Sequence, residues 1–529
     1  MEISTGYFSN VPARTKLFAL LGVILLLALV LRGINLGNHS LWYDEAFAVL
    51  FAEKGLDAML YGTLEPVDGG ASDIHPLLYY ATLNAWMSLV GQGAFAVRLW
   101  SVILGVATVG MMYLLGRELF GMPTGLAAAF VTAIAPFHIQ YSQEARMYVL
   151  LGLLLVSATW CFVKGWRAID MRSGGWRWMV GFGIMAALAM YTQQLAAFYL
   201  VALALVPIFA RRGDQIKGMV IGGLVALAVY LPWMFQLPGQ FSKVRSYYWL
   251  APPNVAQPLL TIRSFLVVNL DFTTGSLIGF LGALFLVLFL IIQVAMVSRR
   301  RLASENWSLR LVLWLAFGPP LLMWLVSQVQ AVYLERALLP SALMLYLALG
   351  WLFARGRMPR PIAVLVGVVG LALVAIGLFH QYTWDTFPNS PFRPAGEYIR
   401  DHWQEGDVVV HQNKLTALPM IYYERDVTQH YISDAPGSPQ DTLALPTQES
   451  LGLLADACVQ MASAGGSRVW WVTFDFAREQ YAAADRPDFA QAKSWLDQHY
   501  SQVETVGFND LEIVLYTDPD LPAADCEDI

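Results

Sequence analysis

Long runs of apolar residues fill the first 380 residues of the chain, and none occurs after His380. A helix needs about 20 apolar residues to cross the roughly 30 Å hydrocarbon core of a bilayer. Residues 76–90 form a shorter run that Asn84 interrupts, and we interpret it as a helix lying at the membrane surface. We predict eleven membrane spans, which begin near Lys16, Ala94, Gly121, Arg146, Trp178, Leu195, Gly218, Gly275, Leu309, Glu335 and Pro361.

The pattern changes after residue 380. Short apolar segments predict strands, and they alternate with amphipathic segments that predict helices. The strands are expected at 406–411, 427–432, 467–474 and 511–517, and the helices at 415–424, 449–464 and 489–500. This alternation is typical of a layered α/β domain with a mostly parallel sheet.

The expected fold class is therefore a polytopic α-helical membrane protein with a C-terminal extracytoplasmic α/β domain. We expect a transmembrane domain at 1–380, the α/β domain at 381–518 and a disordered tail at 519–529.

Composition and charge indicate two physical environments. The chain holds 14% charged residues, against about 25% in soluble proteins. Up to residue 380 there are 25 Lys and Arg against 15 Asp and Glu, and after it 8 against 24. Because the net charge is −6 and Lys and Arg cluster only in short loops, we exclude a nucleic-acid binder.

The distribution of basic residues predicts the orientation. With eleven spans, 17 of the 25 basic residues lie in loops on one side, which is therefore cytoplasmic. Counting 76–90 as a twelfth span would move the basic loop at 164–177 outside, so we reject it. The N-terminus is then cytoplasmic, with its first apolar run kept as an anchor. Residues 34–95, 236–274 and everything after 380 are expected outside the cytoplasm.

Three cysteines are too few for a disulfide-stapled fold and lack the spacing of a metal site. Cys458 and Cys526 both lie on the expected outer side and can pair. Because Cys526 lies in an acidic tail that we expect to be frayed, we favour two free thiols over a disulfide.

The first outside loop carries Asp44 and Glu45 about a dozen residues after the first span. Adjacent side chains on a helix point about 100° apart, so the two carboxylates are not expected to act as a pair. One can face a site while the other caps a helix. The alternative is an acidic first turn that the helix dipole favours.

A second polar cluster occupies residues 137–150, at the outer junction of the third and fourth predicted spans. Ionisable groups at membrane depth cost about 2.5 to 3.5 kcal/mol each, so they persist where they pair or serve a site. On a continuous helix, Glu144 and Tyr148 would share one face. A structural Glu144–Arg146 pair or a snorkelling arginine is the alternative. The cluster comprises His138, Tyr141, Gln143, Glu144, Arg146 and Tyr148.

A third cluster is Glu335 and Arg336, at the outer start of the tenth predicted span. A guanidinium there can bind a phosphate with two hydrogen bonds and stays charged. An interfacial anchor paired with Glu335 is the alternative.

Weaker candidates accompany these clusters. His75 has only Asp73 as a nearby partner in sequence for a metal. Arg98 and Arg263 are expected as boundary anchors. Lys243 and Arg245 suit a mobile clamp on a lipid phosphate, or belong to a solvated loop.

The clusters, in this order and on this side, resemble the GT-C class of glycosyltransferases that use polyprenyl-phosphate sugars. The likeness is to the bacterial branch related to protein O-mannosyltransferases and the lipid A aminoarabinose transferase. It covers roughly residues 15–350. The matching segments are WYDEA at 42–46, HPLLYY at 75–80, YSQEARMY at 141–148 and the pair at 335–336. The sequence departs from the family where Leu77 replaces the second proline of HPP and Gln193 replaces a histidine.

The resemblance implies an inverting transfer of a hexosyl or pentosyl group, mannosyltransferase-like, from a polyprenyl-phosphate donor to an acceptor hydroxyl. Because the donor has a good leaving group, the reaction needs a base and a cation rather than two flanking carboxylates. Asp44 would be the base and Glu144 a second catalytic group that orients Arg146 or the acceptor. Arg336, Arg146 and Lys243 would bind the donor phosphate.

Further residues of the clusters would bind substrate, and a divalent metal cation is a possible cofactor. These residues are Glu45, His75, Tyr141, Tyr148 and Glu335. The acceptor (protein, lipid or glycan) and the sugar stay open, and neither a P-loop nor a strand-borne GxGxxG is present.

Two functions other than glycosyl transfer are alternatives for this sequence. A transporter or flippase of lipid-linked sugars could line a path with the same charges, but no internal repeat is visible and the charges concentrate on the outer side. A non-enzymatic sensor would leave the clusters at Asp44 and Glu144 unexplained.

Overall fold

The computed structural model describes residues 13–67, 70–71, 73–246, 250–268, 273–298, 303–356, 358–434, 443–483, 488–517 and Cys526. The chain forms two compact units. The first comprises Met1–Ile34, Leu99–Phe235 and Leu250–Tyr382, and the second comprises Asn35–Arg98, Gln236–Trp249 and Thr383–Ile529.

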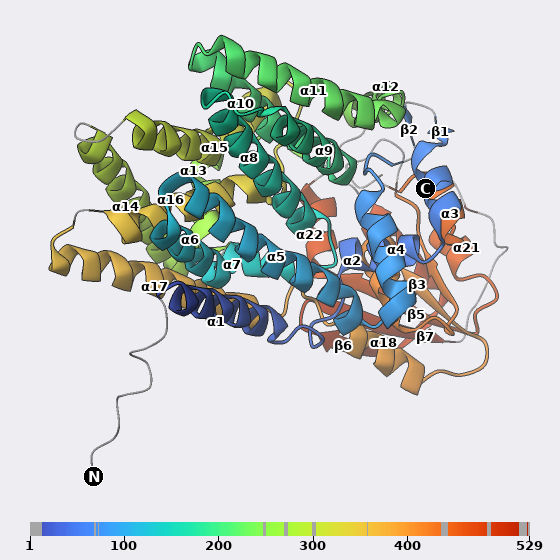
Figure 1. Ribbon diagram of the computed structural model, residues 1–529. Coiled ribbons are helices and arrows are strands. Elements are labelled where there is room, and N and C mark those ends of the chain that lie inside the picture. Colours follow the sequence, from blue (N-terminus) through green and yellow to red (C-terminus); the bar gives the residue numbers. More distant parts are fainter. Residues whose placement is uncertain are drawn as a thin grey trace. The chain divides into compact units, whose positions relative to one another are not determined.

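The first unit is helical (Figure 1). Its helices are α1 (Ala13–Gly33), α5 (Ala94–Phe120), α6 (Met122–Ile134), α7 (Pro136–Ser142), α8 (Tyr148–Asp170), α9 (Trp176–Thr192), α10 (Ala196–Phe209), α11 (Gly213–Met234), α13 (Gln257–Val267), α14 (Thr273–Ser298), α15 (Ala303–Ser327), η1 (Glu335–Leu338), α16 (Leu339–Arg355) and α17 (Arg360–Thr383). The first turn of α5 and the last residue of α17 belong to the second unit.

Each of the eleven predicted spans is helical, but not all are long enough to cross a bilayer. Among the described residues eight helices are, and α6 with α7 form a ninth if that pair, bent by 64°, is one span. The helices α9 and α10 have only 17 and 14 residues. The apolar run continues across both, but the chain leaves the helix at Gln193–Leu195 and so divides it. The protein is a multi-pass membrane protein.

Glycines let the helices of this unit approach closely. A Cβ added at Gly350 of α16 would lie 2.5 Å from the main-chain nitrogen of Ala128 in α6. One added at Gly116 of α5 would lie 2.9 Å from Cα of Gly125, again in α6. Small residues at helix crossings are typical of membrane proteins, where backbone contact and dispersion drive association. This packing fixes α6, which leads into the cluster at 137–150.

The second unit contains one five-stranded sheet and short helices (Figure 1). Its elements are α2 (Tyr43–Ala52), α3 (Leu56–Leu64), β1 (Pro66–Val67), β2 (Gly70–Ala71), α4 (Leu78–Val90), α12 (Leu237–Ser246), α18 (Phe392–Asp401), β3 (Asp407–His411), α19 (Lys414–Tyr423), β4 (Gln429–Tyr431), α20 (Leu445–Leu451), α21 (Val459–Ala462), β5 (Arg468–Phe474), α22 (Asp475–Ala483), α23 (Asp488–His499), β6 (Ser501–Phe508) and β7 (Leu511–Thr517).

The sheet has the strand order β4-β3-β5-β7-β6, with β3 parallel to β4 and β5, and β7 antiparallel to β5 and β6. Alternate residues of β3 and β5 point to opposite faces. Val409 and Trp470 pack into one core, and Val408 and Trp471 into the other. Both faces are therefore covered, which explains why β3 is a continuous apolar run.

The predicted α/β domain is confirmed, with corrections. The prediction of a mostly parallel sheet was wrong, because the last two strands return antiparallel and only two of the four strand pairs are parallel. Strand β6 was not predicted, because its residues are polar and mostly exposed and give no apolar alternation. The predicted helix at 449–464 was wrong as one element. Gly452 adopts a positive φ of 70° and ends α20, and α21 starts only at Val459.

The chain passes from the first unit to the second at Tyr382, close to the expected boundary. Unlike the expected division, however, the second unit also takes in residues 35–98 and 236–249, which belong to the two long loops between predicted spans. The Thr447 hydroxyl donates to the carbonyl of Gly62 (2.8 Å) and the Ser450 hydroxyl to that of Ala58 (3.0 Å). A Cβ at Gly62 would lie 2.5 Å from Oγ of Ser450. Helix α20 therefore packs directly against α3.

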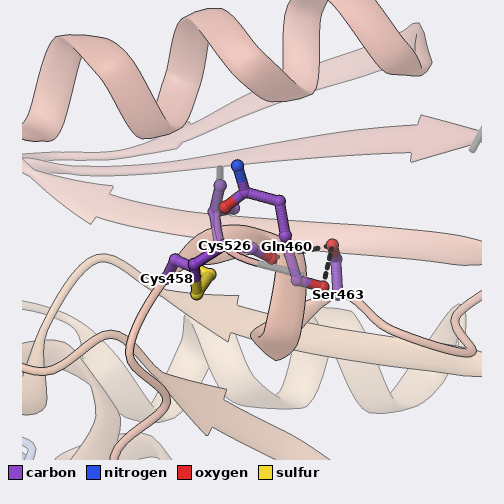
Figure 2. Close-up of a disulfide and its surroundings, with 5 residues drawn as sticks. Cys458, Gln460, Ser463 and Cys526 are labelled. Atoms are coloured by element: carbon purple, nitrogen blue, oxygen red, sulfur yellow. Dashed lines mark hydrogen bonds between the residues drawn. A yellow bond between two sulfur atoms is a disulfide. The ribbon is translucent and has the colours of Figure 1, made fainter. Parts of the chain in front are cut away.

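Cys458 and Cys526 form a disulfide across 68 residues of sequence. Figure 2 shows it beside α21, where the Ser463 hydroxyl donates to the carbonyls of Val459 (2.8 Å) and Gln460 (3.4 Å). The favoured expectation of two free thiols was therefore wrong, because Cys526 lies close enough to Cys458 to be bonded to it. The predicted disordered tail at 519–529 otherwise lies outside the described residues.

Removing this disulfide should destabilise the second unit. A cross-link that closes a loop of this length typically contributes about 2–4 kcal/mol. We expect Cys458→Ser to lower the midpoint of thermal unfolding, and a reductant to lower that of the wild type to the same value. The control is Cys161→Ser, which removes the free thiol of α8. Equal midpoints for Cys458→Ser and the wild type would contradict the prediction.

Candidate active site

The residues predicted for the site fall in both units. Asp44, Glu45, His75 and Lys243 belong to the second unit. Those of the first unit are Tyr141, Glu144, Arg146, Tyr148, Glu335 and Arg336. Each group is described within its own unit.

Arg98 holds the start of α2 in place. Its guanidinium donates to both carboxylate oxygens of Glu45, at 2.8 and 2.6 Å. It also donates to three main-chain carbonyls of the preceding loop, those of Leu36 (3.1 Å), His39 (2.8 Å) and Ser40 (2.9 Å). These five hydrogen bonds use all five N–H donors of the guanidinium.

Glu45 is fully buried, whereas Asp44 is half-buried in the same first turn. The two carboxylates therefore diverge, as their adjacent positions predict. We expected Glu45 to contact the substrate. Both oxygens of its carboxylate instead accept hydrogen bonds from Arg98. Arg98 is thus not the boundary anchor that the sequence indicated. The sequence contained a signal for this ion pair, because an arginine inside an apolar run requires a partner.

Two further bonds fix the loop before Asp44. The main-chain N–H of Leu41 donates to the Tyr423 hydroxyl (2.8 Å), and that of Arg393 donates to the Ser40 hydroxyl (3.0 Å). Asp44 then lies where the N-terminal dipole of α2 favours a carboxylate. Its place is set by contacts distant in sequence.

Asp73 organises a second cluster in this unit. Its carboxylate accepts from the main-chain N–H of Ile74 (2.6 Å) and lies 2.9 Å from Nδ1 of His75. The Gln240 side chain of α12 donates to the Asp73 carbonyl (3.2 Å). Burial raises the pKa of the Asp73 carboxyl, but the His75 and Lys243 side chains and the Ile74 N–H outweigh it and lower this pKa to about 2.

Lys243 lies in helix α12 and is buried, so the expected solvated loop was wrong at this residue. The described residues contain no group of three or more His, Cys, Asp or Glu side chains that could hold a metal ion. His75 and Asp73 are therefore a hydrogen-bonded pair to which the described residues add no third ligand of these types.

In the first unit, Arg32 holds the break between α6 and α7. Pro136 has no N–H, so the carbonyl of Thr132 loses its helical donor. Arg32 replaces it, donating to the carbonyls of Thr132 (3.1 Å) and Ala133 (2.9 Å). The remaining donors reach the carbonyl of Ala28 (3.0 Å), the hydroxyl of Ser142 (3.2 Å) and Nδ1 of His138 (2.6 Å).

This arginine is fully buried, and the sequence reasoning assigned it no role. Because the guanidinium only donates, Nδ1 of His138 must accept, which puts the proton of the neutral ring on Nε2. The Gln143 side chain also donates to the carbonyl of Ile34 (2.7 Å) just beyond α1. Arg32 and Gln143 together fix the segment in which Glu144 and Arg146 follow.

The second and third predicted clusters meet at Tyr148. The Arg336 guanidinium lies over the Tyr148 ring, 5.1 Å from its centroid, which is a cation–π arrangement. The ring of Tyr141 contacts that of Tyr148 edge-on, with 5.6 Å between centroids. Residues 143–147 lie between α7 and α8 and are not helical, so the predicted shared helix face of Glu144 and Tyr148 was wrong.

Glu335 is held from α13. Its carboxylate accepts from the Thr261 hydroxyl (3.2 Å), which in turn accepts from the Tyr333 hydroxyl (2.9 Å). Arg263, expected as an anchor, is buried and donates to Ser276 (2.7 Å). The unit thus brings together an arginine and two tyrosines, Arg336, Tyr148 and Tyr141, with Glu335 next to Arg336 in the chain.

Comparisons with known proteins show what the chain is similar to. The family described as dolichyl-phosphate-mannose-protein mannosyltransferase matches residues 74–235. The chain is 25% identical over 218 residues to the candidate mannosyltransferase YkcB of Bacillus subtilis, covering 39% of this chain and 29% of YkcB. It is 27% identical over 232 residues to an undecaprenyl phosphate-alpha-4-amino-4-deoxy-L-arabinose arabinosyl transferase of Pseudomonas aeruginosa, covering 41% and 40%. It therefore spans less than half the length of these relatives.

The fold is similar to a crystal structure of ArnT from Cupriavidus metallidurans bound to undecaprenyl phosphate. The TM-score is 0.61 at 12% identity, and the match covers 95% of this chain and 98% of ArnT. The predicted resemblance is confirmed at the level of fold, and the chain has the GT-C fold. The family match includes His75 and residues 141–148, but neither Asp44 nor Arg336.

Replacing Arg98 should unfold the start of α2. Arg98→Lys keeps the charge opposite Glu45 but has too few donors for the carbonyls of Leu36, His39 and Ser40, and each buried carbonyl left without a donor costs about 1–3 kcal/mol. We expect a lower midpoint of thermal unfolding. The control is Arg478→Lys, where the ion pair with Asp475 is partly exposed and such pairs contribute about 0–1 kcal/mol. Similar midpoints for the two variants would refute the role of Arg98.

Arg32→Met should destabilise the first unit, because it leaves the carbonyls of Thr132 and Ala133 without their donor at about 1–3 kcal/mol each. Lys16→Met is the control, since Lys16 is exposed in the same helix. Thermal unfolding followed by tryptophan fluorescence measures both. An unchanged midpoint for Arg32→Met would show that these carbonyls find other donors.

Proposed function

We propose that this protein is an integral membrane glycosyltransferase. It moves a sugar from a polyprenyl-phosphate donor to an acceptor hydroxyl on the outer face of the membrane, by inverting displacement. The observation that carries the proposal is the convergence of Arg336 on Tyr148 and Tyr141, which joins two clusters distant in sequence on a GT-C fold. A phosphate requires such a fixed cation in an apolar setting.

The chemistry assigns one role to each cluster. Asp44 takes the proton of the acceptor hydroxyl as its oxygen attacks the anomeric carbon, and the bond to the polyprenyl phosphate breaks. Arg336, with Arg146, stabilises the charge that grows on the departing phosphate. Because that phosphate leaves as an anion, no acid is needed to protonate it.

The donor class is supported from two sides. ArnT, which shares the fold, was solved with undecaprenyl phosphate, and a P. aeruginosa relative is named for an undecaprenyl-phosphate-linked sugar. The first unit also has an apolar cavity of about 330 Å³ lined by residues of α6, α13, α14, α16 and α17, among them Phe130, Phe265 and Tyr346. An isoprenoid segment suits such a lining.

The cation in this mechanism is arginine. A divalent metal would need a set of carboxylate or imidazole ligands, and the described residues provide no group of three. We therefore derive no step through a metal. Lys243 lies beside Asp73, so we assign it to that cluster first and to the donor phosphate second.

The outer face is supported by two independent signals. The basic residues of the loops concentrate on the side opposite to the C-terminal unit. In addition, Cys458 and Cys526 form a disulfide, which persists in oxidising compartments and is rare in the cytosol. We place the protein in the cell membrane with a cytoplasmic N-terminus.

The test is release of polyprenyl phosphate by the purified protein in detergent, with a panel of polyprenyl-phosphate sugars. Asp44→Asn should lower the rate about 10²- to 10⁴-fold, as expected for loss of a general base. The matched control is Asp57→Asn, because Asp57 is an exposed acid in the first turn of α3. It should transfer like the wild type.

Equal rates for Asp44→Asn and the wild type would remove Asp44 as the base. A wild type that binds these lipids but releases polyprenyl phosphate from none of them would favour the flippase instead. Translocation requires no base, so the two functions separate in this assay.

A further inference from the structure

The second unit contains a cavity of about 560 Å³ that the proposed mechanism does not use. It is bordered by one face of α18, the end of α19 and the turn between α4 and α5. Pockets for small molecules typically measure about 300–1,000 Å³. The cavity is therefore large enough for one or two sugar rings.

Its charged lining alternates in sign. The Arg393 guanidinium donates to the Glu397 carboxylate at 2.9 Å, and that of Arg400 to the Glu424 carboxylate at 2.9 Å. Arg425 also lines the cavity and pairs with Glu53, 3.0 Å away. Arg400 lies 3.1 Å from Asp401 as well. The arginines are thus compensated, which disfavours a phosphate and suits a ligand without strong net charge.

Such pairs present donors and acceptors side by side. The side chains of Arg393 and Arg400 are 53% and 50% exposed, so each has further N–H groups within reach of a ligand. A sugar hydroxyl both donates and accepts, and neighbouring hydroxyls can therefore bond a carboxylate and a guanidinium together. This is the polar chemistry of saccharide recognition.

Aromatic side chains supply the apolar part of the lining. Tyr422, Tyr423 and Phe95 border the cavity, and Phe95 is 54% exposed. The Tyr422 hydroxyl donates to the carbonyl of Gln92 (2.6 Å), which ties α19 to the turn before α5. The C–H faces of a sugar ring can pack on such side chains, while rigid walls keep the cost of ordering low.

The cavity is connected to the loop that carries Asp44. Tyr423 accepts the N–H of Leu41, three residues before Asp44, and the main-chain N–H of Arg393 bonds Ser40. Two lining residues are thus bonded to the loop that Arg98 holds. The cavity also includes Ala94 and Phe95, the first residues of the candidate span α5.

We infer that this cavity binds a saccharide, and that the saccharide belongs to the acceptor. The second statement rests on the proposed function, and the first does not. The sugar can be free or the headgroup of a glycolipid, since both present the same hydroxyls. The C-terminal unit would then select the acceptor while its outside loop supplies the base.

Binding tests the inference without requiring transfer. The full-length protein is presented with a panel of defined soluble oligosaccharides and with the same headgroups on lipids in nanodiscs. The double variant Arg393→Gln/Arg400→Gln should bind the preferred saccharide at least tenfold more weakly and raise KM for the acceptor more than it lowers kcat. The two arms of the panel distinguish a free glycan from a glycolipid.

Lys493→Gln is the matched control. Lys493 and Asp497 form an i, i+4 ion pair on α23 as Arg393 and Glu397 do on α18, but they do not line the cavity. Lys493→Gln should bind like the wild type, and thermal unfolding should show both variants folded.

Three outcomes would overturn the inference. In the first, the wild type binds no member of either panel. In the second, the double variant binds the saccharide as well as the wild type does. In the third, the wild type binds vesicles of anionic phospholipid at the cavity but none of the saccharides. If saccharide binding depends on Arg393 and Arg400 but the protein has no transferase activity, the saccharide site is supported and the proposed function is refuted. If transfer depends on Asp44 but the double variant binds saccharide as well as the wild type, the proposed function is supported and the saccharide site is refuted.

Discussion

Both units depend on a buried guanidinium that bonds main-chain carbonyls. Arg32 in the first unit and Arg98 in the second each make five hydrogen bonds, and each is almost completely inaccessible to solvent. A charge in apolar surroundings is costly unless every donor is used. Each arginine is therefore stable only in one local arrangement, which it imposes on the loop around it.

The two arginines act where helices begin or break. Arg32 donates to the Thr132 carbonyl, which Pro136 deprives of its helical donor, and to that of Ala133, and so fixes the turn from α6 into the segment of Glu144 and Arg146. Arg98 fixes the loop before α2, and so the first turn in which Asp44 lies. Reactive groups at a membrane surface need such support, because a displacement of about 1 Å can cost a hundredfold in rate.

The helices that pack around the C-terminal sheet also help to hold the loop before α2. Helices α19 and α20 bond the segment at 35–98 through Tyr423, Thr447 and Ser450. This segment and the α/β domain therefore form one compact unit. The domain thus supports the loop of the proposed base, and it also contributes the cavity for which we propose a saccharide ligand.

The periodic and compositional features could be predicted from the order of the amino acids alone. Long apolar runs predicted the eight described helices that are long enough to cross a bilayer, and short apolar segments predicted β3, β5 and β7. The end of the long apolar runs and the change in charge balance predicted the boundary near residue 380. The sequence also indicated the polar clusters at helix ends, because ionisable residues beside apolar runs are conspicuous. It missed strand β6 and the end of α20 at Gly452, where polarity and one glycine conformation outweigh the local pattern.

Which of these residues contact one another depends on the fold of the whole chain. Asp44 and Glu45 are neighbours of equal charge, yet Arg98, more than fifty residues later, buries only Glu45. Arg336 reaches Tyr148 across nearly two hundred residues, and Cys458 bonds Cys526. A sequence pattern reports the period and polarity of a segment, but a side chain's partner depends on which surfaces pack together, and that is fixed only when the whole chain has folded.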